Sequence, residues 1–273
     1  MFLRFAPLIS GSRGNSLYIG AGDTHVLVDA GASMAKLLEQ MRAANVDPRD
    51  LDLILITHEH ADHIQGAGIL SRKFNLPICA TEGTWQSMDQ KIGKIAPENR
   101  RILHAGQDFY IGQMNIMPFS IPHDANDPVG YSFRLGGLKC AVATDLGCIK
   151  SDWLDEVAGC DVLLLESNHD VDMLHAGPYP YALKKRILGK RGHLSNDDCG
   201  KAVVELAKRG VGHIILGHLS GENNHPDLAM LTVEMALRAE GIEPGKHIGL
   251  SLARRDCLCG VFTLAIGGMA GAE

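Results

Sequence analysis

The sequence predicts an α/β protein of four layers, in the order helix–sheet–sheet–helix, and two observations support this prediction. Strand-like and helix-like segments occur in both halves of the 273-residue chain, so each half can supply one sheet and the helices that cover it. Side chains that commonly bind metals follow strand-like runs in both halves. We therefore predict a single domain over residues 1–273, with a functional site along one edge of the sandwich.

The first half of the chain is predicted to begin with strands joined by tight turns. Residues 1–9 are apolar except for Arg4, and a hairpin turn at 21–23 precedes a strand over 24–28. Ser33 is a typical helix N-cap, and apolar residues follow it at helical spacing: Met34, Leu37, Leu38 and Met41. A strand over 53–57 and a helix from about 63 to 74 complete the predicted elements of this half.

The second half first alternates in the manner of β-hairpins, over residues 108–121 and 129–144. Strands and helices then alternate, with strands predicted at 161–166, 212–217 and about 247–253 and helices at 195–209 and 226–240. The glycine-rich tail, residues 266–273, is expected to fray.

Composition narrows the class of protein. The apolar fraction of 45% allows a sizeable core. The sequence has no run of about 20 apolar residues, so no membrane-spanning helix is expected. Seven cysteines without a disulfide-like spacing indicate reduced thiols, so we expect a cytoplasmic protein. The net charge of −6 gives no overall basic surface for nucleic acid, which would need a local patch. The sequence does not indicate an oligomeric state.

The most informative feature is an HxHxDH cluster that follows the apolar run at 53–56. It places four side chains that can bind metals within six residues: His58, His60, Asp62 and His63. Imidazole and carboxylate together suit Zn²⁺, Mn²⁺ or Fe rather than Ca²⁺ or Mg²⁺. A chance grouping in a polar loop would explain one histidine but not three with an interleaved aspartate. The cluster therefore predicts a metal site.

Further ligands are expected at other strand ends, because one loop cannot supply a dinuclear centre. Four segments end a predicted strand in an Asp or a His, at Asp29, His123, Asp145 and His218. Each alone could be a capping or hydrogen-bonded residue. Four of them together with the cluster predict two metal ions.

The order Asp, HxHxDH, His, Asp, His resembles the metallo-β-lactamase superfamily over nearly the whole chain. The resemblance implies a four-layer αββα sandwich with two divalent metal ions, Zn or Mn and possibly Fe. One ion would be held by His58, His60 and His123 and the other by Asp62, His63 and His218. Asp145 would bridge the two ions, and Asp29 would orient the HxHxDH loop.

Two positions point to the chemistry within this superfamily. Asp145 stands where β-lactamases of this fold have Cys, and His60 stands where flavodiiron oxidases have Glu. The set resembles the phosphodiesterases, nucleases and thioesterases of the superfamily, and it argues against a β-lactam substrate.

Several blocks resemble the YycJ/WalJ group of bacterial 5′→3′ exonucleases. They are SGSRGNS at 10–16, THEH at 57–60, LESNHD at 165–170, GHLSN at 192–196, and HLS at 218–220 followed by Asn223 and Asn224. The GHLSN block is also similar to that of the tRNA 3′-processing endonucleases, where the first His contacts the scissile phosphate. The resemblance implies a 5′→3′ exonuclease that uses a metal-activated hydroxide and acts on DNA rather than RNA.

The catalytic residues implied are Asp62, His193 and Asp29, with His193 stabilising the phosphate and protonating the leaving group. Candidates for substrate binding come from three places: Ser12 and Asn15; Lys184, Lys185 and Arg186; and Asn223 and Asn224. The basic stretch lies near Tyr179 and Tyr181, which could stack on bases. A solvated helix face explains the stretch alone, and its position just before His193 favours a role in binding.

Two other functions stay open at this stage. The acidic net charge favours a small-molecule phosphodiesterase or a thioesterase of the same fold. A metal-dependent binding module without turnover would be expected to have lost ligands, and the sequence retains them all.

Overall fold

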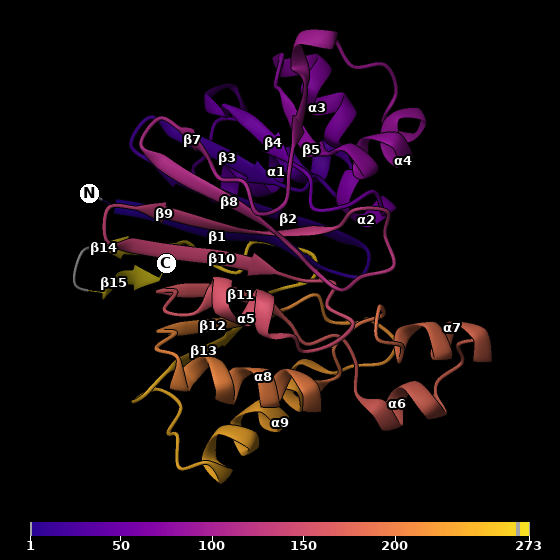
Figure 1. Cartoon of the computed structure of the whole chain (residues 1–273), viewed down its shortest axis with the longest axis vertical. Coiled ribbons are helices and arrows are strands. Elements are labelled where there is room, and N and C mark those ends of the chain that lie inside the picture. Colours follow the sequence, from indigo (N-terminus) through magenta and orange to yellow (C-terminus); the bar gives the residue numbers. More distant parts are fainter. Residues whose placement is uncertain (1, 266–267, 273) are drawn as a thin grey trace.

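The computed structural model describes residues 2–265 and 268–272, and their strands form two mixed sheets that lie face to face (Figure 1). The first sheet has eight strands in the order β15 (Gly268–Ala272), β14 (Phe262–Ala265), β1 (Phe2–Gly11), β2 (Gly14–Ala21), β3 (Thr24–Val28), β4 (Leu53–Leu55), β5 (Ile78–Thr81) and β6 (Arg100–Leu103). The second has seven, in the order β13 (Gly249–Leu252), β12 (His213–Gly217), β11 (Val162–Glu166), β10 (Leu138–Ala143), β9 (Val129–Leu135), β8 (Met114–Ser120) and β7 (Phe109–Ile111).

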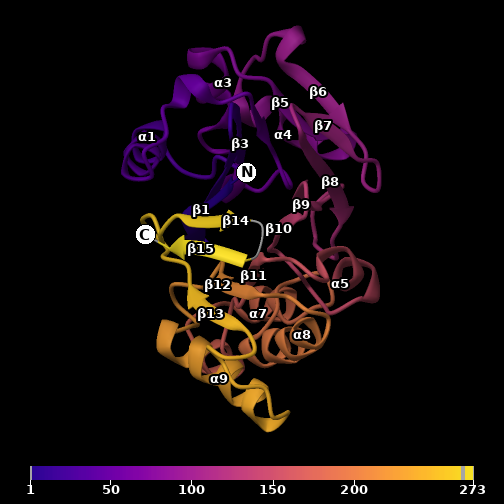
Figure 2. The same ribbon diagram turned by 90° about the vertical axis from the view of Figure 1, so that its left-hand side faces the viewer.

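Helices cover the outer face of each sheet (Figure 2). The first sheet packs against α1 (Met34–Ala43), α3 (Ala67–Phe74) and α4 (Glu82–Ile92), and the second against α5 (Ser151–Val157), α8 (Asn196–Lys208) and α9 (Pro226–Ala239). Three short helices lie at one end of the sandwich: α2 (Ala61–Ile64), α6 (Val171–Ala176) and α7 (Tyr181–Ile187) (Figure 1). The predicted four-layer α/β fold is confirmed.

The hydrophobic core has three parts, one for each contact between layers. Strand β1 shows how the two-residue period of a strand produces this arrangement. Leu3 and Phe5 point between the sheets, whereas Ala6 and Leu8 point toward the helices of the first sheet. Because both faces of such strands are buried, they appear in the sequence as continuous apolar runs.

Strand direction brings several strand ends to one edge of the sandwich. Strands β3 to β6 are parallel to one another, and so are β10 to β13. Strand β8 also runs parallel to β10, since both pair antiparallel with β9. The carboxyl ends of parallel strands meet at the same edge of a sheet, which is where α/β proteins place their sites.

Two predicted elements differ in the structure. The helix expected from about 63 to 74 is divided into α2 and α3 at Gly66. Gly66 donates its N–H to the carbonyl of Ala30 at 2.7 Å, and a Cβ there would lie 2.5 Å from the carbonyl oxygen of Ala32. This close approach ties the helix break to the loop after β3, so the side chains of α2 point to the sheet edge.

The tail expected to fray over 266–273 instead continues as β15, which pairs antiparallel with β14 over 268–272. Backbone hydrogen bonds to a neighbouring strand need no large side chains, so a glycine-rich segment can extend a sheet edge. Residues 266, 267 and 273 lie outside the described residues. The organisation of the chain as one domain stays a prediction.

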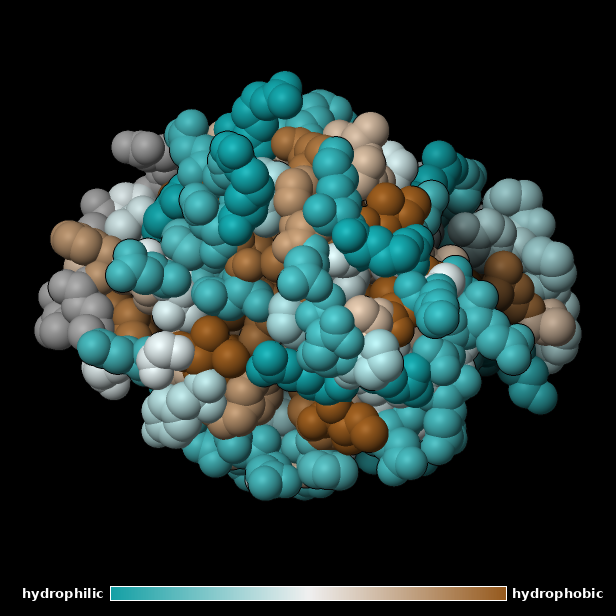
Figure 3. Space-filling model, turned by 90° about the horizontal axis from the view of Figure 1, so that it is seen from above, coloured by the Kyte–Doolittle hydropathy of each residue, from teal (hydrophilic) through white to brown (hydrophobic). Residues whose placement is uncertain are grey.

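The face of the molecule over the helices of the first sheet is mostly hydrophilic, with apolar side chains scattered across it (Figure 3). Among the described residues, none of the helices has the length and apolar character needed to span a bilayer.

Candidate metal centre

Three strand ends turn sharply at residues that are not glycine. Asp29 after β3, Asp145 after β10 and His218 after β12 have φ angles of 58°, 61° and 54°. This left-handed conformation costs free energy for a residue with a Cβ and is typical of functional sites. In each case it turns a polar side chain out of the strand direction and into the edge of the sandwich.

The loop that carries the HxHxDH cluster is fixed by Asp29. One carboxylate oxygen of Asp29 accepts the backbone N–H of Thr57 at 2.8 Å, and the other accepts the Thr57 hydroxyl at 2.8 Å. The second oxygen also lies 2.8 Å from Nδ1 of His63. Asp29 therefore orients both ends of this loop, the role expected for it from the sequence.

Four histidines are anchored through Nδ1, which leaves Nε2 to face the centre of the site. The Nδ1 atoms lie 3.0 Å from the hydroxyl of Thr57 for His58, 2.8 Å from Asp29 for His63, 3.1 Å from the carbonyl of Gly192 for His123, and 2.8 Å from Glu166 for His218. Bonds of this kind hold a metal-binding imidazole in one tautomer and one orientation.

The donor atoms converge in two groups. In the first, Nδ1 of His60 lies 3.0 Å from Nε2 of His58 and 3.2 Å from Nε2 of His123. In the second, Oδ2 of Asp62 lies 3.5 Å from Nε2 of both His63 and His218. Within each group the donor atoms all lie within 4.8 Å of one another.

Asp145 lies between the two groups. Its Oδ2 is 3.4 Å from Nε2 of His63, and its Oδ1 is 3.7 Å from Nε2 of His123. The Asp145 side chain is buried, and its Oδ2 atom has no hydrogen-bond partner. A carboxylate in this position can serve both groups at once.

These residues fit a pair of divalent cations. Ring nitrogens with lone pairs that face one another, beside a buried carboxylate oxygen without a partner, are balanced by a shared positive ion. Burial lowers the pKa of His58, His60 and His123, so these rings are neutral, as metal binding requires. Burial alone would raise the pKa of Asp145, but the nearby histidines outweigh burial and lower it.

Glu166, the last residue of β11, joins the metal centre to a further histidine. Its Oε1 lies 2.7 Å from Nδ1 of His193 and 2.8 Å from Nδ1 of His218. Its Oε2 accepts the backbone N–H groups of Leu146 and Leu194 at 2.7 and 3.1 Å. The fully buried carboxylate thus orients two imidazoles and uses all of its acceptor capacity within the protein.

His193 lies at the border of the site and keeps 19% of its side chain exposed. Its Nδ1 is bonded to Glu166, so its Nε2 is the atom available to a substrate. Burial opposes the charged form of this ring, but Glu166 outweighs burial and raises the pKa of His193.

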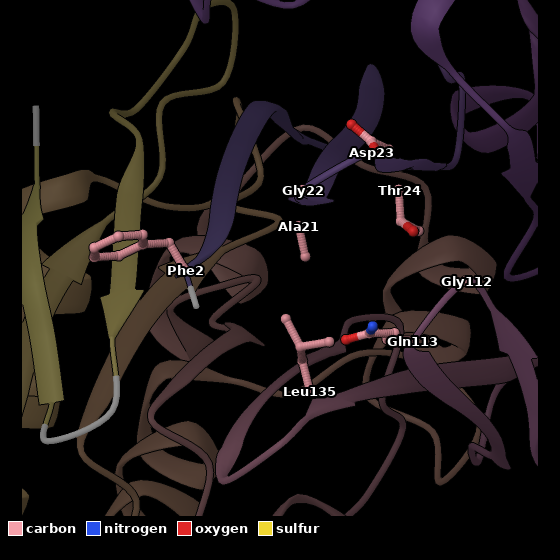
Figure 4. A pocket seen from close by; sticks show the side chains of 8 residues that line it. All are labelled: Phe2, Ala21, Gly22, Asp23, Thr24, Gly112, Gln113 and Leu135. Atoms are coloured by element: carbon pink, nitrogen blue, oxygen red, sulfur yellow. The ribbon is translucent and has the colours of Figure 1, made fainter.

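A cavity of about 370 Å³ opens over the two groups. It is lined by residues of the metal groups, by His193, by Ser12, Asn168 and Ser220 from neighbouring loops, and by Tyr179, Leu183, Arg186 and Ile187 from α7 and the segment before it. A larger cavity of about 570 Å³ lies at the opposite ends of β2 and β3 and contains none of the metal-binding side chains; its lining includes Phe2, Asp23, Gln113 and Leu135 (Figure 4). Size alone therefore does not identify the functional cavity.

Comparison with known proteins agrees with this geometry. Residues 24–218 match the family described as the beta-lactamase superfamily domain. The chain belongs to this superfamily. It is 38% identical to the exodeoxyribonuclease YycJ of Bacillus anthracis over 246 residues, which are 90% of this chain and 93% of that protein. It is 40% identical to the exodeoxyribonuclease WalJ of Streptococcus pneumoniae serotype 2 over 232 residues, 84% of this chain and 86% of that protein.

Solved structures of the superfamily share the fold. The metallo-beta-lactamase fold protein YhfI from Bacillus subtilis superposes with a TM-score of 0.71 at 17% identity, covering 94% of this chain and 99% of that one. Membership in the superfamily, together with 38–40% identity to exodeoxyribonucleases over most of the chain, identifies a metal-dependent hydrolase. The predicted resemblance to the YycJ/WalJ group is confirmed.

The structure brings the predicted metal-binding residues into the groups expected for them. The seven side chains come from the ends of β4, β8, β10 and β12 and from α2: His58, His60, Asp62, His63, His123, Asp145 and His218. Their individual roles as ligands stay a prediction.

Three of the predicted substrate-binding residues do not line the cavity over the metal groups. Asn15 is buried, and its amide contacts the carbonyl of Gly11 at 3.1 Å and Oδ2 of Asp62 at 3.2 Å, so it positions a metal-binding carboxylate. Asn224 is buried and donates to the carbonyls of Ser167 and Asn168, and Asn223 is 1% exposed. None of the three asparagines lines the cavity, so direct substrate contact is withdrawn for them.

The basic helix α7 is only partly directed at the site. Arg186 lines the cavity and pairs with Asp124, its Nη2 lying 2.9 Å from Oδ1. Lys184 instead donates to the carbonyl of His175 at 2.7 Å, and Lys185 is exposed. Ser12 is exposed and lines the cavity, and its role in substrate binding stays a prediction.

Glu166 and Asn168 are the functional residues that sequence reasoning did not assign. Asn168 donates to the carbonyl of His218 at 2.9 Å and so holds the turn after β12. The sequence does contain a signal for Glu166. It is the last residue of a buried apolar strand, and Asp29 and Asp145 likewise stand where a buried apolar strand passes into a loop. No strand-end pattern distinguishes Asn168 from a loop residue.

Proposed function

We propose that this chain is a metal-dependent phosphodiesterase that degrades DNA as a 5′→3′ exonuclease. The observation that carries the proposal is a pair of convergent donor groups, bridged by Asp145, beside a histidine that Glu166 orients and that keeps one nitrogen free. The relatives at 38–40% identity are named exodeoxyribonucleases, which supports DNA as the substrate.

His58, His60 and His123 would hold one divalent ion, and Asp62, His63 and His218 the other, with Asp145 in contact with both. Imidazole and carboxylate donors suit Zn²⁺ or Mn²⁺, and also Fe. When bound, two such ions supply a water activated near neutral pH and neutralise charge on the phosphate.

The remaining chemistry falls to residues of the chain. His193, held through Nδ1 by Glu166, offers Nε2 to an oxygen of the scissile phosphate and protonates the leaving oxygen. Asp29 keeps the HxHxDH loop and His63 in place and does not touch the substrate. Asp62 is a metal-binding carboxylate, and Asn15 limits its rotation.

Substrate enters past Ser12 and α7. Arg186 places a guanidinium at the cavity, and Asp124 fixes its orientation through two contacts. Tyr179 lines the same cavity and presents an aromatic ring on which a base can stack. This local positive charge can bind a polyanion although the whole chain carries a net charge of −6.

The test uses DNA duplexes labelled at the 5′ end or at the 3′ end, a matched RNA duplex, and bis(p-nitrophenyl) phosphate. Protein of verified metal content is incubated with each substrate in the presence of Mn²⁺, and an Asp145→Ala variant serves as the inactive control. We expect early release of the 5′ label as a short product and progressive shortening of the 3′-labelled strand.

Other outcomes identify other functions. Hydrolysis of bis(p-nitrophenyl) phosphate without loss of DNA would overturn the nuclease proposal in favour of a small-molecule phosphodiesterase. Faster loss of RNA than of DNA would change the substrate class, and early release of the 3′ label would reverse the polarity.

We also infer that the protein works in the cytoplasm. All seven cysteines are free, and Cys79, Cys140, Cys160 and Cys199 are buried, which suits a reducing compartment.

A further inference from the structure

A second, smaller cavity lies beside the metal centre and contains two arginines. Its volume is about 130 Å³, and its lining comprises Gly11, Ser12, Arg13, Gly221, Arg255 and Asp256. Ser12 lines both this cavity and the one over the metal groups, so the two adjoin. Arg255 lies three residues beyond β13, whose carboxyl end shares the functional edge with that of β12.

The Arg255 side chain is held against the backbone of two loops of the site. A Cβ on Gly11 would lie 2.9 Å from Cγ of Arg255, and one on Gly221 would lie 3.2 Å from its Nη1. Nη1 also lies 3.4 Å from the carbonyl oxygen of Ser220, two residues after His218. The missing side chains at these two glycines therefore leave the room that the arginine occupies.

The loops themselves are tied together at this point. The N–H of His218 donates to Oγ of Ser10 at 3.0 Å, and the N–H of Ser10 donates to the carbonyl of Arg254 at 3.1 Å. The half-buried Arg255 is consequently fixed relative to His218 through backbone contacts, rather than being a mobile surface side chain.

The charge of Arg255 is not balanced by a carboxylate. Within the part of the chain that the structure describes, no Asp or Glu oxygen lies within 4.0 Å of its guanidinium. Arg13 makes one contact of 3.5 Å with Glu222, and both of these side chains are largely exposed. Asp256 also lines the cavity and opposes the binding of an anion there. A half-buried guanidinium that lines a cavity and has no carboxylate partner indicates a site for an anion.

We propose that Arg255, assisted by Arg13, binds the phosphate of the DNA backbone next to the scissile one. The cavity has room for a group of that size but not for a nucleoside, and its place beside Ser12 continues the path of a strand that lies over the metal centre. The proposal rests on the proposed function, because a neighbouring phosphate is present in DNA but absent from a simple phosphodiester. The bound phosphate is either the 5′-terminal group of the strand or an internal one.

The experiment compares Arg255→Gln with the wild-type enzyme on three substrates: DNA with a 5′-phosphate, the same DNA with a 5′-hydroxyl, and bis(p-nitrophenyl) phosphate. Arg254→Gln is the matched control, since it removes the same charge from the preceding residue, whose exposed side chain does not line the cavity. We expect the ratio of kcat/KM on DNA to kcat/KM on bis(p-nitrophenyl) phosphate to fall about tenfold in Arg255→Gln, through KM, as for the loss of a hydrogen bond to a charged group.

Two further measurements test the same site. The slope of log affinity for DNA against log salt should decrease by about one in Arg255→Gln, because one phosphate contact is lost. Asp256→Asn should change KM for DNA in the opposite direction, since it removes the negative charge that faces the same cavity.

The outcomes separate the proposals. A larger loss on 5′-phosphorylated DNA assigns the site to the terminal phosphate, and an equal loss on both DNAs assigns it to an internal phosphate. An unchanged substrate ratio, with DNA still degraded, overturns this site and leaves the proposed function intact. Failure of the wild-type enzyme to degrade DNA overturns the proposed function and this site with it.

Discussion

Individual residues at the metal centre adopt conformations that a stable fold alone would avoid. Asp29, Asp145 and His218 all have positive φ angles, at a cost of about 1–3 kcal/mol each. Their side chains are then held by contacts that a straight strand end could not make, such as those of Asp29 with Thr57 and His63. The strain is concentrated at the edge where Asp145 and His218 must face the donor groups and Asp29 must face the loop that carries the other ligands.

His193 is expected to act on the substrate and not on the metals. His193→Ala should reduce kcat by about 10²–10⁴-fold, the contribution of a general acid, while both metal ions stay bound. Glu166→Gln should give a smaller loss in the same direction, because the ring stays but is no longer oriented by a carboxylate. Steady-state kinetics with metal analysis of the same samples provide the measurement. Loss of metal from His193→Ala would make His193 a ligand and would contradict its assigned role.

His169 predicts a pH dependence of stability that does not involve the metal-binding residues. It is 1% exposed, neither ring nitrogen has a hydrogen-bond partner, and burial lowers its pKa to about 4. In the unfolded chain this ring takes up a proton near pH 6.5, whereas in the folded protein it stays neutral down to about pH 4. The free energy of unfolding therefore keeps its full value above pH 6.5 and decreases as the pH falls toward 4. The contribution is up to roughly 3 kcal/mol.

Urea unfolding of the wild-type protein and of His169→Gln between pH 7 and pH 4 measures this contribution. The free energy of unfolding should decrease more steeply in the wild-type protein than in the variant over this range. Parallel pH curves for the two proteins would show that His169 is protonated equally in the folded and unfolded states.

At the scale of elements, the loop after β3 and helix α2 fit together through Gly31. The N–H of Gly31 donates to the carbonyl of Asn15 at 2.8 Å, and a Cβ on Gly31 would collide with the backbone carbonyl of Asp62. The position of Asp62 and His63 therefore depends on close backbone contact and not only on side-chain bonds.

Gly31→Ala should consequently displace α2. We expect a loss of about 1–3 kcal/mol in the free energy of unfolding, as for overpacking, together with weaker metal binding. Thermal unfolding and metal titration provide the measurements, with Gly137→Ala as the control because nothing lies within 4 Å of a Cβ there. Equal metal affinity in Gly31→Ala and the wild-type protein would show that α2 is positioned by other contacts.

Helix α7 supplies the positive charge nearest the cavity. Reversing the charge of Lys184, Lys185 and Arg186 should weaken DNA binding and reduce its dependence on salt, with most of the effect due to Arg186, which lines the cavity. Affinity is measured from 50 to 200 mM salt, and Lys208→Glu on α8 is the control. An unchanged salt slope would show that α7 is an ordinary solvated helix face.

How far sequence predicts such a structure depends on the kind of signal. Long periodic segments such as 195–209 and 226–240 were located correctly to within one residue at each end, because buried helix faces repeat regularly. Short elements such as α5, α6 and β14 are not predicted, since four to seven residues are too few to show a period. The metal cluster was visible because its residues are adjacent in sequence, whereas the inward turn of Asn15 depends on the distant Asp62.

At the scale of the whole molecule, the site exists only where the two sheets meet. The first sheet supplies Asp29 and the HxHxDH loop, and the second supplies His123, Asp145, Glu166 and His218. Asp145 comes from the second sheet and lies close to both donor groups, with one carboxylate oxygen near His63 and the other near His123. The arrangement therefore predicts that two metal ions bind as a pair and that both depend on Asp145.

Metal content measured by plasma mass spectrometry tests this claim most directly. Protein saturated with Zn²⁺ or Mn²⁺ and freed of excess metal should contain close to two ions per chain. Asp145→Ala should contain one or fewer, while Asp89→Ala, an exposed change on α4, should retain two. Two ions in Asp145→Ala, or one or none in the saturated wild-type protein, would contradict a dinuclear centre bridged by this residue.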